Sequence, residues 1–502
     1  MRISAIPPAS KEGERLSFPV HRPILLLLLA PAIGCLGEAP APEVHPDLDI
    51  PPAWTGGGAS PGSPRDDWWK TFADPALENL LAEGLRRNHA LGAAAERLRA
   101  AAVQARIAGA DLWPQVSGAF DGGRTKRVFV GFPIPGSSGP LKSFTNTYGV
   151  SLDLTWEIDL WGRIRAGRNA ALKDFEAKKA DLEGAQLSLS GQIAKAWFAL
   201  REATAQVELA ERTAANNRRT VELTKARYAS GRTALLDLEL LKQRAADSLS
   251  AVSSAKRAED AARRQLEILI GRYPKGLLPT ASDLPPLPPL PPAGIPASVL
   301  DRRPDLRAAA AEVLADLARE REARASLYPR ISLTTGIGTR SDELGDLIDG
   351  DFSVWNLAGN LLAPIFQGGR LRARVALQES ATRERLERFA DQALQAFKEV
   401  ETALAAEDFL KAERAALAKS LEASERAYDL ARERYLSGRT DVLQLLDAER
   451  STFAVRSRLL RLDLLALTNR IDLHLALGGS FPRTAPPGDP VSVLPHEEEE
   501  HE

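Results

Sequence analysis

Two long stretches of the chain place apolar residues at alternating steps of four and three. A sustained period of 3.5 residues is typical of helices packed as a coiled coil. The first stretch runs without a proline from Arg163 to Tyr228, so at ~1.5 Å per residue its helix would be roughly 100 Å long. Neither stretch contains a run of apolar residues long enough for a transmembrane helix, and we expect both helices to stand in water. The two stripes are Leu182, Gln186, Leu189, Ile193, Ala196, Leu200, Ala203, Val207, Ala210 and Ala214, and Phe389, Ala393, Ala396, Val400, Ala403, Glu407, Leu410, Arg414, Leu417 and Leu421.

A second pattern, alternation at every other residue, predicts two β-hairpins at about 114–160 and 329–366. Strict alternation indicates strands with one apolar and one polar face. The pattern is cleanest in one strand of the first hairpin and weaker in the second hairpin. The apolar members of the clean strand are Val150, Leu152, Leu154, Trp156 and Ile158, and its polar members are Ser151, Asp153, Thr155 and Glu157.

Three short motifs occur twice in the same order, which indicates an internal duplication. Two of them, Arg-Tyr-x-Ser-Gly-Arg-Thr and Gly-Arg-(Ile/Leu)-Arg-Ala, return after 207 residues, and the third returns after 215. A period this long means two copies of one plan: helix, hairpin, very long helix, sharp turn and long helix. The repeated segments are 227–233 and 434–440, 162–166 and 369–373, and 112–117 and 327–332.

The duplication sets the expected domain organisation. Each repeat begins with a helix, about Leu91–Leu112 in the first and about Pro304–Leu327 in the second, and a proline two residues later ends it. A proline-rich run between the repeats is typical of an extended connector. The expected segments are 68–273 for the first repeat with its long helix pair at 163–270, 274–296 for the connector, 297–478 for the second repeat with its long helix pair at 369–477, and 479–502 for a disordered tail.

The first residues indicate export. After Arg22 comes an apolar stretch of about ten residues, which is too short to span a bilayer as a helix and is typical of the core of a signal peptide. The sequence Ala-Ile-Gly-Cys at its end resembles a lipoprotein signal-peptidase box, and Cys35 is the only cysteine. We therefore expect a signal peptide at 1–34, a covalent lipid anchor on Cys35, and a Pro- and Gly-rich tether at 35–67. An incidental cysteine is the alternative.

Composition excludes several classes of function. Lys and Arg total 65 against 67 Asp and Glu, so the chain lacks the basic surplus of a nucleic-acid-binding protein. One cysteine allows no internal disulfide and no cysteine-based metal site, and the six histidines show no metal-ligand spacing. We find no nucleophile–base pair, and we expect no catalytic, cofactor or metal site. The His- and Glu-rich end at 496–502 is expected to be solvated, with weak metal binding as the alternative.

Four strands cannot close a barrel, and no further strands are evident in the sequence to cover their apolar face. An open sheet edge is not tolerated in lipid, so other copies of the chain must close the sheet. Two copies would give eight strands with a filled interior, whereas three would give twelve strands and room for a passage. In such a barrel the lipid-facing residues would be Leu152, Leu154 and Trp156, and the lumen-facing residues Ser151, Asp153, Thr155 and Glu157.

Taken together, these features resemble the TolC-like outer-membrane efflux proteins, and among them the lipid-anchored subgroup that serves resistance-nodulation-division (RND) pumps. The resemblance implies a mainly α chain that trimerises into a shared twelve-stranded outer-membrane β-barrel, continued by a long periplasmic α-helical barrel. It also implies a passive channel without enzymatic activity, joined through a periplasmic adaptor protein to an inner-membrane RND transporter. It covers about 68–478, and the matching segments are 161–166, 302–309, 366–373, 445–448 and the two turns at 227–233 and 434–440.

The resemblance also assigns roles to residues at the two turns, which should lie at the periplasmic tip. The family's paired helix tips engage adaptor hairpins, although a purely structural turn is the alternative. Leu443 and Asp447 match positions that constrict the family's channel, and Asp441 is a further gate candidate. Three copies of Asp447 would form a carboxylate ring that attracts cations, whereas the alternative is a solvated acidic residue. The docking candidates are Arg227, Ser230, Gly231, Arg232, Arg434, Ser437, Gly438 and Arg439.

Two other functions stay open from the sequence. The first is a channel for type I protein secretion, although the lipid-anchor signal and the RND-type motifs weigh against it. The second is a structural periplasmic coiled-coil lipoprotein without a lumen, which would keep both hairpins out of the membrane. The exported solute, a drug or a metal ion, is not determined by the sequence.

Overall fold

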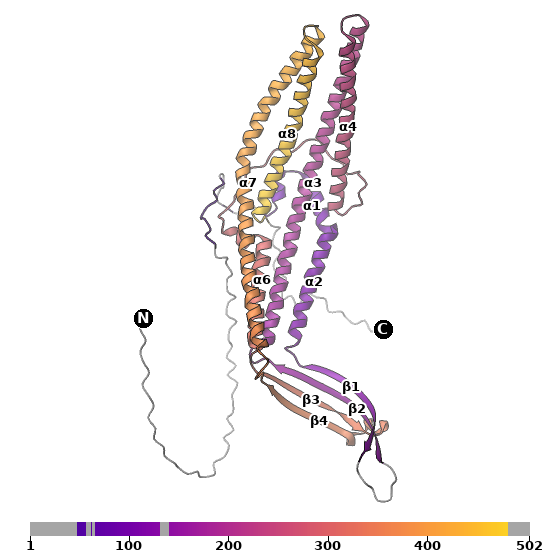
Figure 1. Ribbon diagram of the computed structural model, residues 1–502, viewed down its shortest axis with the longest axis vertical. Coiled ribbons are helices and arrows are strands. Elements are labelled where there is room, and N and C mark those ends of the chain that lie inside the picture. The colour runs from indigo at the N-terminus through magenta and orange to yellow at the C-terminus, as the bar shows by residue number, and fades with distance from the viewer. Residues whose placement is uncertain (1–47, 57–61, 63–65, 131–139, 480–502) are drawn as a thin grey trace, which may run out of the picture. The chain divides into compact units, whose positions relative to one another are not determined.

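The computed structural model describes residues 48–56, 62, 66–130 and 140–479. This part of the chain is mainly α-helical and contains one four-stranded antiparallel sheet (Figure 1). The expected signal peptide, Cys35 and the His- and Glu-rich tail lie outside the described residues. Among the described residues, no helix is both long enough and apolar enough to cross a membrane.

The internal duplication is visible in the lengths of the helices. Each helix of the first repeat has a counterpart of the same length in the second, with 67, 35 and 22 residues in the three pairs. The pairs are α3 (Arg163–Ala229) with α7 (Arg370–Leu436), α4 (Leu235–Leu269) with α8 (Val442–Ala476), and α2 (His89–Ala110) with α6 (Pro304–Ala325).

The sheet has the order β1-β2-β3-β4, so each strand pairs with its neighbours along the chain. The first hairpin is the longer one, with 15 and 18 residues in its strands against 12 and 10 in the second. Two short 3₁₀ turns, η2 (Leu344–Ile348) and η3 (Gly350–Phe352), connect the strands of the second hairpin. The strands are β1 (Gln115–Phe129), β2 (Leu141–Ile158), β3 (Arg330–Ser341) and β4 (Ser353–Leu362).

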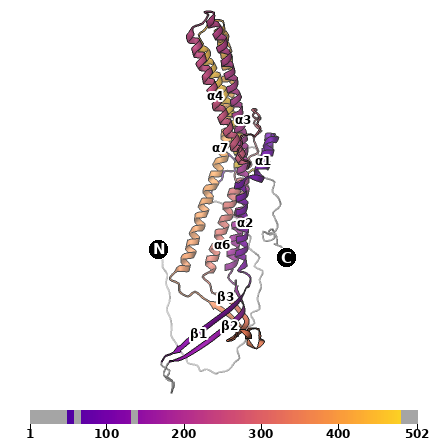
Figure 2. The ribbon, with the colours of Figure 1, turned by 90° about the vertical axis from the view of Figure 1, so that its right-hand side faces the viewer.

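Each long helix pairs with the helix that follows it, and α3 joins the two repeats. Helix α3 contacts α4, α2, α6 and α8, and α7 contacts α8 and α6, as Figures 1 and 2 show. The predicted stripe of α3 is largely buried, and Ile193 and Leu200 are fully enclosed. The polar interruptions of the α7 stripe are explained by ion pairs with α8, because Glu407 pairs with Arg470 and Arg414 pairs with Asp463.

The sequence analysis did not identify α1 (Pro75–Arg87), which packs against α3 beside the 3₁₀ turn η1 (Trp68–Phe72). Asp74 links these elements. One carboxylate oxygen caps α1 by accepting from backbone N–H groups, and the other accepts from Trp197 Nε1 at 2.8 Å and Arg201 at 2.6 Å. This places the buried Trp68 and Phe72 in the first hydrophobic core.

The connector between the repeats lies along two hydrophobic cores. Leu278 belongs to the first core, and Ala293 belongs to a second core that contains Trp54 and α5 (Ser298–Arg302). The buried guanidinium of Arg470 donates to the carbonyl oxygen of Pro288. The extended proline-rich segment is therefore held by side chains of both repeats.

Candidate functional site: the sheet and the helix tips

The sheet presents one apolar face, because residues opposite each other on paired antiparallel strands share a face. Leu152 lies opposite Gly118 on β1 and Ile337 on β3, and Ile337 lies opposite Trp355 on β4. Leu152, Ile337 and Trp355 are 53%, 62% and 77% exposed. A row of large apolar side chains across all four strands is thus open to the surroundings, which marks a surface that another apolar phase covers.

The residues predicted to line the barrel alternate with this apolar row and lie on the opposite face. Ser151 donates from Oγ to Asp153 Oδ2 at 2.6 Å, and Thr155 is exposed. Glu157 forms a bidentate pair with Arg163 at 2.9 and 3.0 Å, where β2 leads into α3. On the apolar face, Leu154 and Trp156 are half-buried, and Trp156 Nε1 donates to the carbonyl of Leu112.

Both outer strands of the sheet have a free edge within the described residues. β1 pairs only with β2, and β4 pairs only with β3. A long free strand edge is a template for pairing with another chain. The apolar face and the two free edges together define a piece of a barrel rather than a complete one.

Aromatic side chains mark the end of the sheet that joins the helices. Trp161 stacks on Tyr328 with ring centroids 4.9 Å apart and donates from Nε1 to the carbonyl of Pro329. Trp113, at the start of β1, is 71% exposed. Trp and Tyr at this height match the aromatic belts found where membrane proteins leave the hydrocarbon core.

The two predicted turns have the same backbone structure. Arg232 N–H donates to the carbonyl of Arg227, and Gly231 N–H donates to the carbonyl of Tyr228. This is a Schellman motif, and it requires the positive φ of 72° that Gly231 adopts. The second turn repeats the two bonds 207 residues later, with Gly438 at a φ of 75°. Ser230 and Ser437 each donate a hydroxyl back to the residue three positions earlier.

The docking candidates do not all face outward. Arg227 is half-buried, donates to the carbonyl of Leu436 and lies 5.6 Å from the ring centroid of Tyr435. The Tyr435 hydroxyl is 3.2 Å from Thr224 Oγ1. Arg227 therefore ties the tip of α3 to the tip of α7. The remaining candidates are exposed: Ser230, Gly231, Arg232, Arg434, Ser437, Gly438 and Arg439.

The three gate candidates have different surroundings. Asp441 caps α8, since its carboxylate accepts from the backbone N–H of Gln444 at 3.0 Å. Asp447 is exposed and pairs with Arg450 at 2.8 Å. Leu443 is 60% exposed and stands one helical turn before Asp447 on the same side of α8. Leu443 and Asp447 are thus free to meet another surface, whereas Asp441 stabilises its own helix.

The sequence analysis missed a buried polar cluster beside the tips. Glu449 on α8 accepts from Asn217 on α3 at 2.9 Å and from Arg244 on α4 at 3.2 Å. Asn217 is 2% exposed and Glu449 is 9% exposed. The available signal was the stripe of α3 itself, which continues beyond Ala214 at the same spacing to polar residues.

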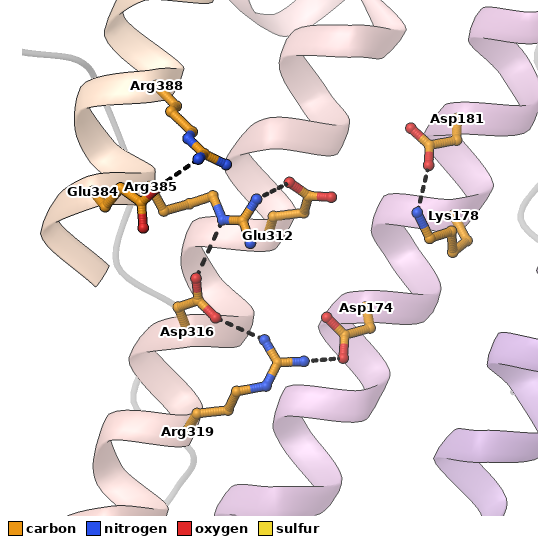
Figure 3. Close-up of polar contacts among 9 residues, drawn as sticks. All are labelled: Asp174, Lys178, Asp181, Glu312, Asp316, Arg319, Glu384, Arg385 and Arg388. Atoms are coloured by element: carbon orange, nitrogen blue, oxygen red, sulfur yellow. Dashed lines mark hydrogen bonds and ion pairs between the residues drawn. The ribbon is translucent and has the colours of Figure 1, made fainter. Parts of the chain in front are cut away.

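A second polar cluster joins three helices nearer the sheet (Figure 3). Asp316 on α6 is 6% exposed and accepts from Arg385 on α7 at 3.2 Å. It also accepts from Arg319, whose other nitrogen pairs with Asp174 on α3. On α3 itself, the hydrogen bond to Asp181 raises the pKa of Lys178. Removing Asp316 would leave two arginines without this shared partner, so the cluster fixes the spacing of α3, α6 and α7.

The bases of α4 and α8 carry different polar residues at matched positions. At Glu267, burial alone would raise the pKa, but three backbone N–H donors of residues 276–278 together hold the pKa below its usual value. At His474, burial first and the charge of Arg470 second lower the pKa to about 4. His474 stacks on Trp68 at 5.6 Å, and neither ring nitrogen has a hydrogen-bond partner among the described residues.

No group of three or more potential metal ligands occurs in the part of the chain that the structure describes. The fold and its surfaces define a channel subunit: an open sheet with an apolar outer face, followed by long amphipathic helices that stand in water. A family model described as "Outer membrane efflux protein" matches residues 80–272 and 295–479. The chain belongs to this family.

Relatives and solved structures agree with this assignment. The pyoverdine export outer membrane protein OpmQ of Pseudomonas putida is 32% identical, with 94% of this chain and all of that protein covered. Outer membrane protein OprJ of Pseudomonas aeruginosa is 31% identical over 91% of this chain and 95% of that protein. The structure of the outer-membrane channel OprN matches with a TM-score of 0.78, at 28% identity over 87% of this chain and 99% of that one. These matches confirm the fold class, the channel function and the outer-membrane location that the resemblance implied.

Proposed function

We propose that three copies of the chain form the outer-membrane channel of a tripartite RND-type efflux system, which passively conducts small toxic solutes, drugs or metal ions, to the exterior. One observation carries the proposal: the four-stranded sheet has an exposed apolar face and two free edges. Closing that sheet with other copies buries the edges and turns the polar face toward a lumen. The energy for transport comes from the inner-membrane transporter.

The assignment of the two sheet faces is tested by labelling single cysteines. Leu152→Cys should react with a maleimide that partitions into lipid and should be protected from a charged, water-soluble one. Asp153→Cys, one residue away on the opposite face, is the matched control and should react with the water-soluble reagent. Free labelling of both positions by the charged reagent would overturn the barrel.

The export role is tested in cells. Deleting the gene should lower resistance to drugs or metal ions, and the intact chain should restore it. If deletion left susceptibility unchanged but stopped the secretion of a protein, the channel would serve type I secretion instead.

We also propose that Leu443 and Asp447 constrict the channel at its periplasmic end, and that Asp441 supports them by capping α8. Both side chains are exposed within one subunit, one turn apart. Leu443→Ala or Asp447→Ala should raise conductance in planar bilayers. The matched control is Leu236→Ala, since Leu236 occupies the same position of the first repeat and is 67% exposed. An equal rise in the control would remove the gate role from Leu443.

The exposed residues of the two turns are proposed to dock the periplasmic adaptor. Replacing Arg434 and Arg439 together by Glu should abolish drug resistance in cells while the trimer still forms. Arg426→Glu provides the control, because Arg426 is exposed on α7 away from the turn and pairs only along its own helix. Equal loss of resistance in the control would place docking elsewhere.

Cys35 is proposed to carry the lipid that anchors each subunit. The mature protein should then begin at residue 35, and its mass should exceed the mass of the polypeptide by that of the lipid. Cys35→Ser should lose the added mass. A mature chain without added mass would show that the barrel alone holds the protein in the membrane.

A further inference from the structure

The β1–β2 ribbon carries a cluster of basic residues on the same face as the apolar row. Its pairing runs without interruption from Gln115 opposite Thr155 to Phe129 opposite Leu141. Since no bulge shifts the register, every second pair lies on one face. Along that face, moving away from the helices, the pairs are Val116 with Leu154, Gly118 with Leu152, Phe120 with Val150, Gly122 with Tyr148, Arg124 with Asn146, Lys126 with Phe144, and Val128 with Lys142.

The three cations of this face gather around one aromatic ring. The guanidinium carbon of Arg124 lies 5.7 Å from the centroid of Phe144, and the Lys126 ammonium lies 5.6 Å from it. Lys142 stands next along the same face, and all three basic side chains are exposed. None of them forms an ion pair within the described residues, so their charges are available to an outside ligand.

The height of the cluster can be estimated from strand geometry. From Ile158 to Tyr148 the strand rises ten residues, which at ~3.3 Å per residue and a tilt of ~40° corresponds to about 25 Å, the height of the apolar band of an outer-membrane barrel. Tyr148 therefore lies at the outer boundary of the band, and the Trp161–Tyr328 pair lies at the inner boundary. Arg124 and Lys126 stand just beyond Tyr148, at the level of the outer headgroups.

We propose that Arg124, Lys126 and Lys142 bind the phosphate groups of anionic lipids in the outer leaflet, with one site on each subunit of the trimer. Arginine and lysine are the side chains that pair with phosphate, and Phe144 and Val128 add apolar contact at the same height. A lipid fits better than a soluble anion because the cluster continues directly from the lipid-facing row. This inference rests on the proposed function, which turns that row toward lipid.

Negative charge is kept away from the site. The connection between β3 and β4 carries carboxylates, and Asp346 is held there by the hydroxyl of Ser341 at 2.8 Å. Ser341 lies opposite Tyr148 on the far side of β2 from β1. A phosphate at the cluster would thus meet the cations of β1–β2 rather than the acidic connection.

The test measures lipid binding to the purified trimer in phosphatidylcholine nanodiscs, with diphosphoryl lipid A as the probe. At about 1 kcal/mol for each basic residue near a charged membrane surface, replacing Arg124, Lys126 and Lys142 together by Gln should weaken lipid A binding at least tenfold. The control is Arg127→Gln, because Arg127 follows Lys126 directly but lies on the lumen-side face opposite Ser143. The control should bind lipid A as the unaltered trimer does.

The outcomes separate this inference from the proposed function. Unchanged lipid A binding by the triple variant, or an equal loss in Arg127→Gln, would overturn the inference. Displacement of lipid A by inorganic phosphate would also overturn it, because the site would then serve a soluble anion. If the inference fails while Leu152→Cys is still labelled only from lipid, the barrel stands without this site. Lys142→Gln alone, with size-exclusion chromatography of the trimer, keeps the test valid should the triple variant misassemble.

Discussion

The two helical hairpins, α3–α4 and α7–α8, share one backbone but not one environment. Their helices have equal lengths, and both tips end in the same Schellman motif. Yet Tyr228 is 42% exposed at the first tip, whereas its counterpart Tyr435 is 3% exposed at the second. The difference arises because α3 supplies Arg227 and Thr224 to cover Tyr435, and no third hairpin of the same chain covers Tyr228. Duplication thus transmits the backbone, and neighbouring helices decide what each copied side chain does.

The sharpest way to break this comparison is to truncate both tyrosines. Tyr435→Ala should destabilise the tip by about 4 kcal/mol, as expected for loss of a buried aromatic side chain. Tyr228→Ala should cost less than about 1 kcal/mol, because its side chain is largely exposed. Hydrogen exchange of the last turns of α3 and α7 measures both effects. Equal protection losses in the two variants would show that the tips are equivalent after all.

The bases of the hairpins provide a pH-dependent contrast. His474 has a pKa of about 4 in the folded chain against about 6.5 in an unfolded one, so between these values only the unfolded chain binds the proton. Stability should therefore fall by about 3 kcal/mol as the pH drops from 6.5 to 4, and should not change through this group above 6.5. Thermal unfolding in detergent across this range measures the loss.

His474→Phe keeps a ring against Trp68 but cannot take up a proton, so it should flatten this part of the pH profile. His89→Gln is the control, since His89 is exposed at the start of α2. An unchanged slope in His474→Phe would assign the acid sensitivity to other groups.

Much of the backbone could be predicted from local pattern. The stripe of period 3.5 predicted α3 and α7, and the alternation at 150–158 predicted β2 with its two faces. Repeated Gly-Arg-Thr sequences predicted both tips. Each of these signals depends on residues close together in the sequence, where periodicity and turn chemistry act directly.

What could not be predicted depends on packing between distant segments. The burial of Tyr435 but not Tyr228 is decided by contacts across more than 200 residues. The same holds for Asn217 and Glu449, whose polar side chains lie where the stripe leads one to expect apolar ones. The short helix α1 was missed although Asp74 and Pro75 form a helix-start signal, because the repeat pattern drew attention to the helix that follows.

The cluster at Glu449 offers the next test of the comparison. Glu449→Ala should destabilise the contact between α3 and α8 by about 2 kcal/mol, because Asn217 would be left buried without its partner. The position 207 residues earlier is Lys242, which is exposed and pairs only with Glu239 on its own helix. Lys242→Ala should therefore be neutral within about 0.5 kcal/mol. Thermal unfolding of the two variants compares them directly, and a neutral Glu449→Ala would show that the cluster adds no stability.

The smallest expected effect concerns the feature that the tips do share. Gly231→Ala and Gly438→Ala should each cost about 1 kcal/mol, because both glycines have a positive φ that a β-carbon disfavours. Space does not distinguish them strongly: a β-carbon at Gly231 meets nothing within 4 Å, and one at Gly438 meets an Arg227 nitrogen at 3.6 Å, an ordinary contact. The costs should therefore be equal, measured by hydrogen exchange at each helix end, and Asn at either position should recover part of the loss because Asn tolerates this conformation. A penalty confined to Gly438→Ala would show that Arg227, rather than backbone strain, sets the cost, and the two turns would then differ even in the one property that the duplicated sequence preserves.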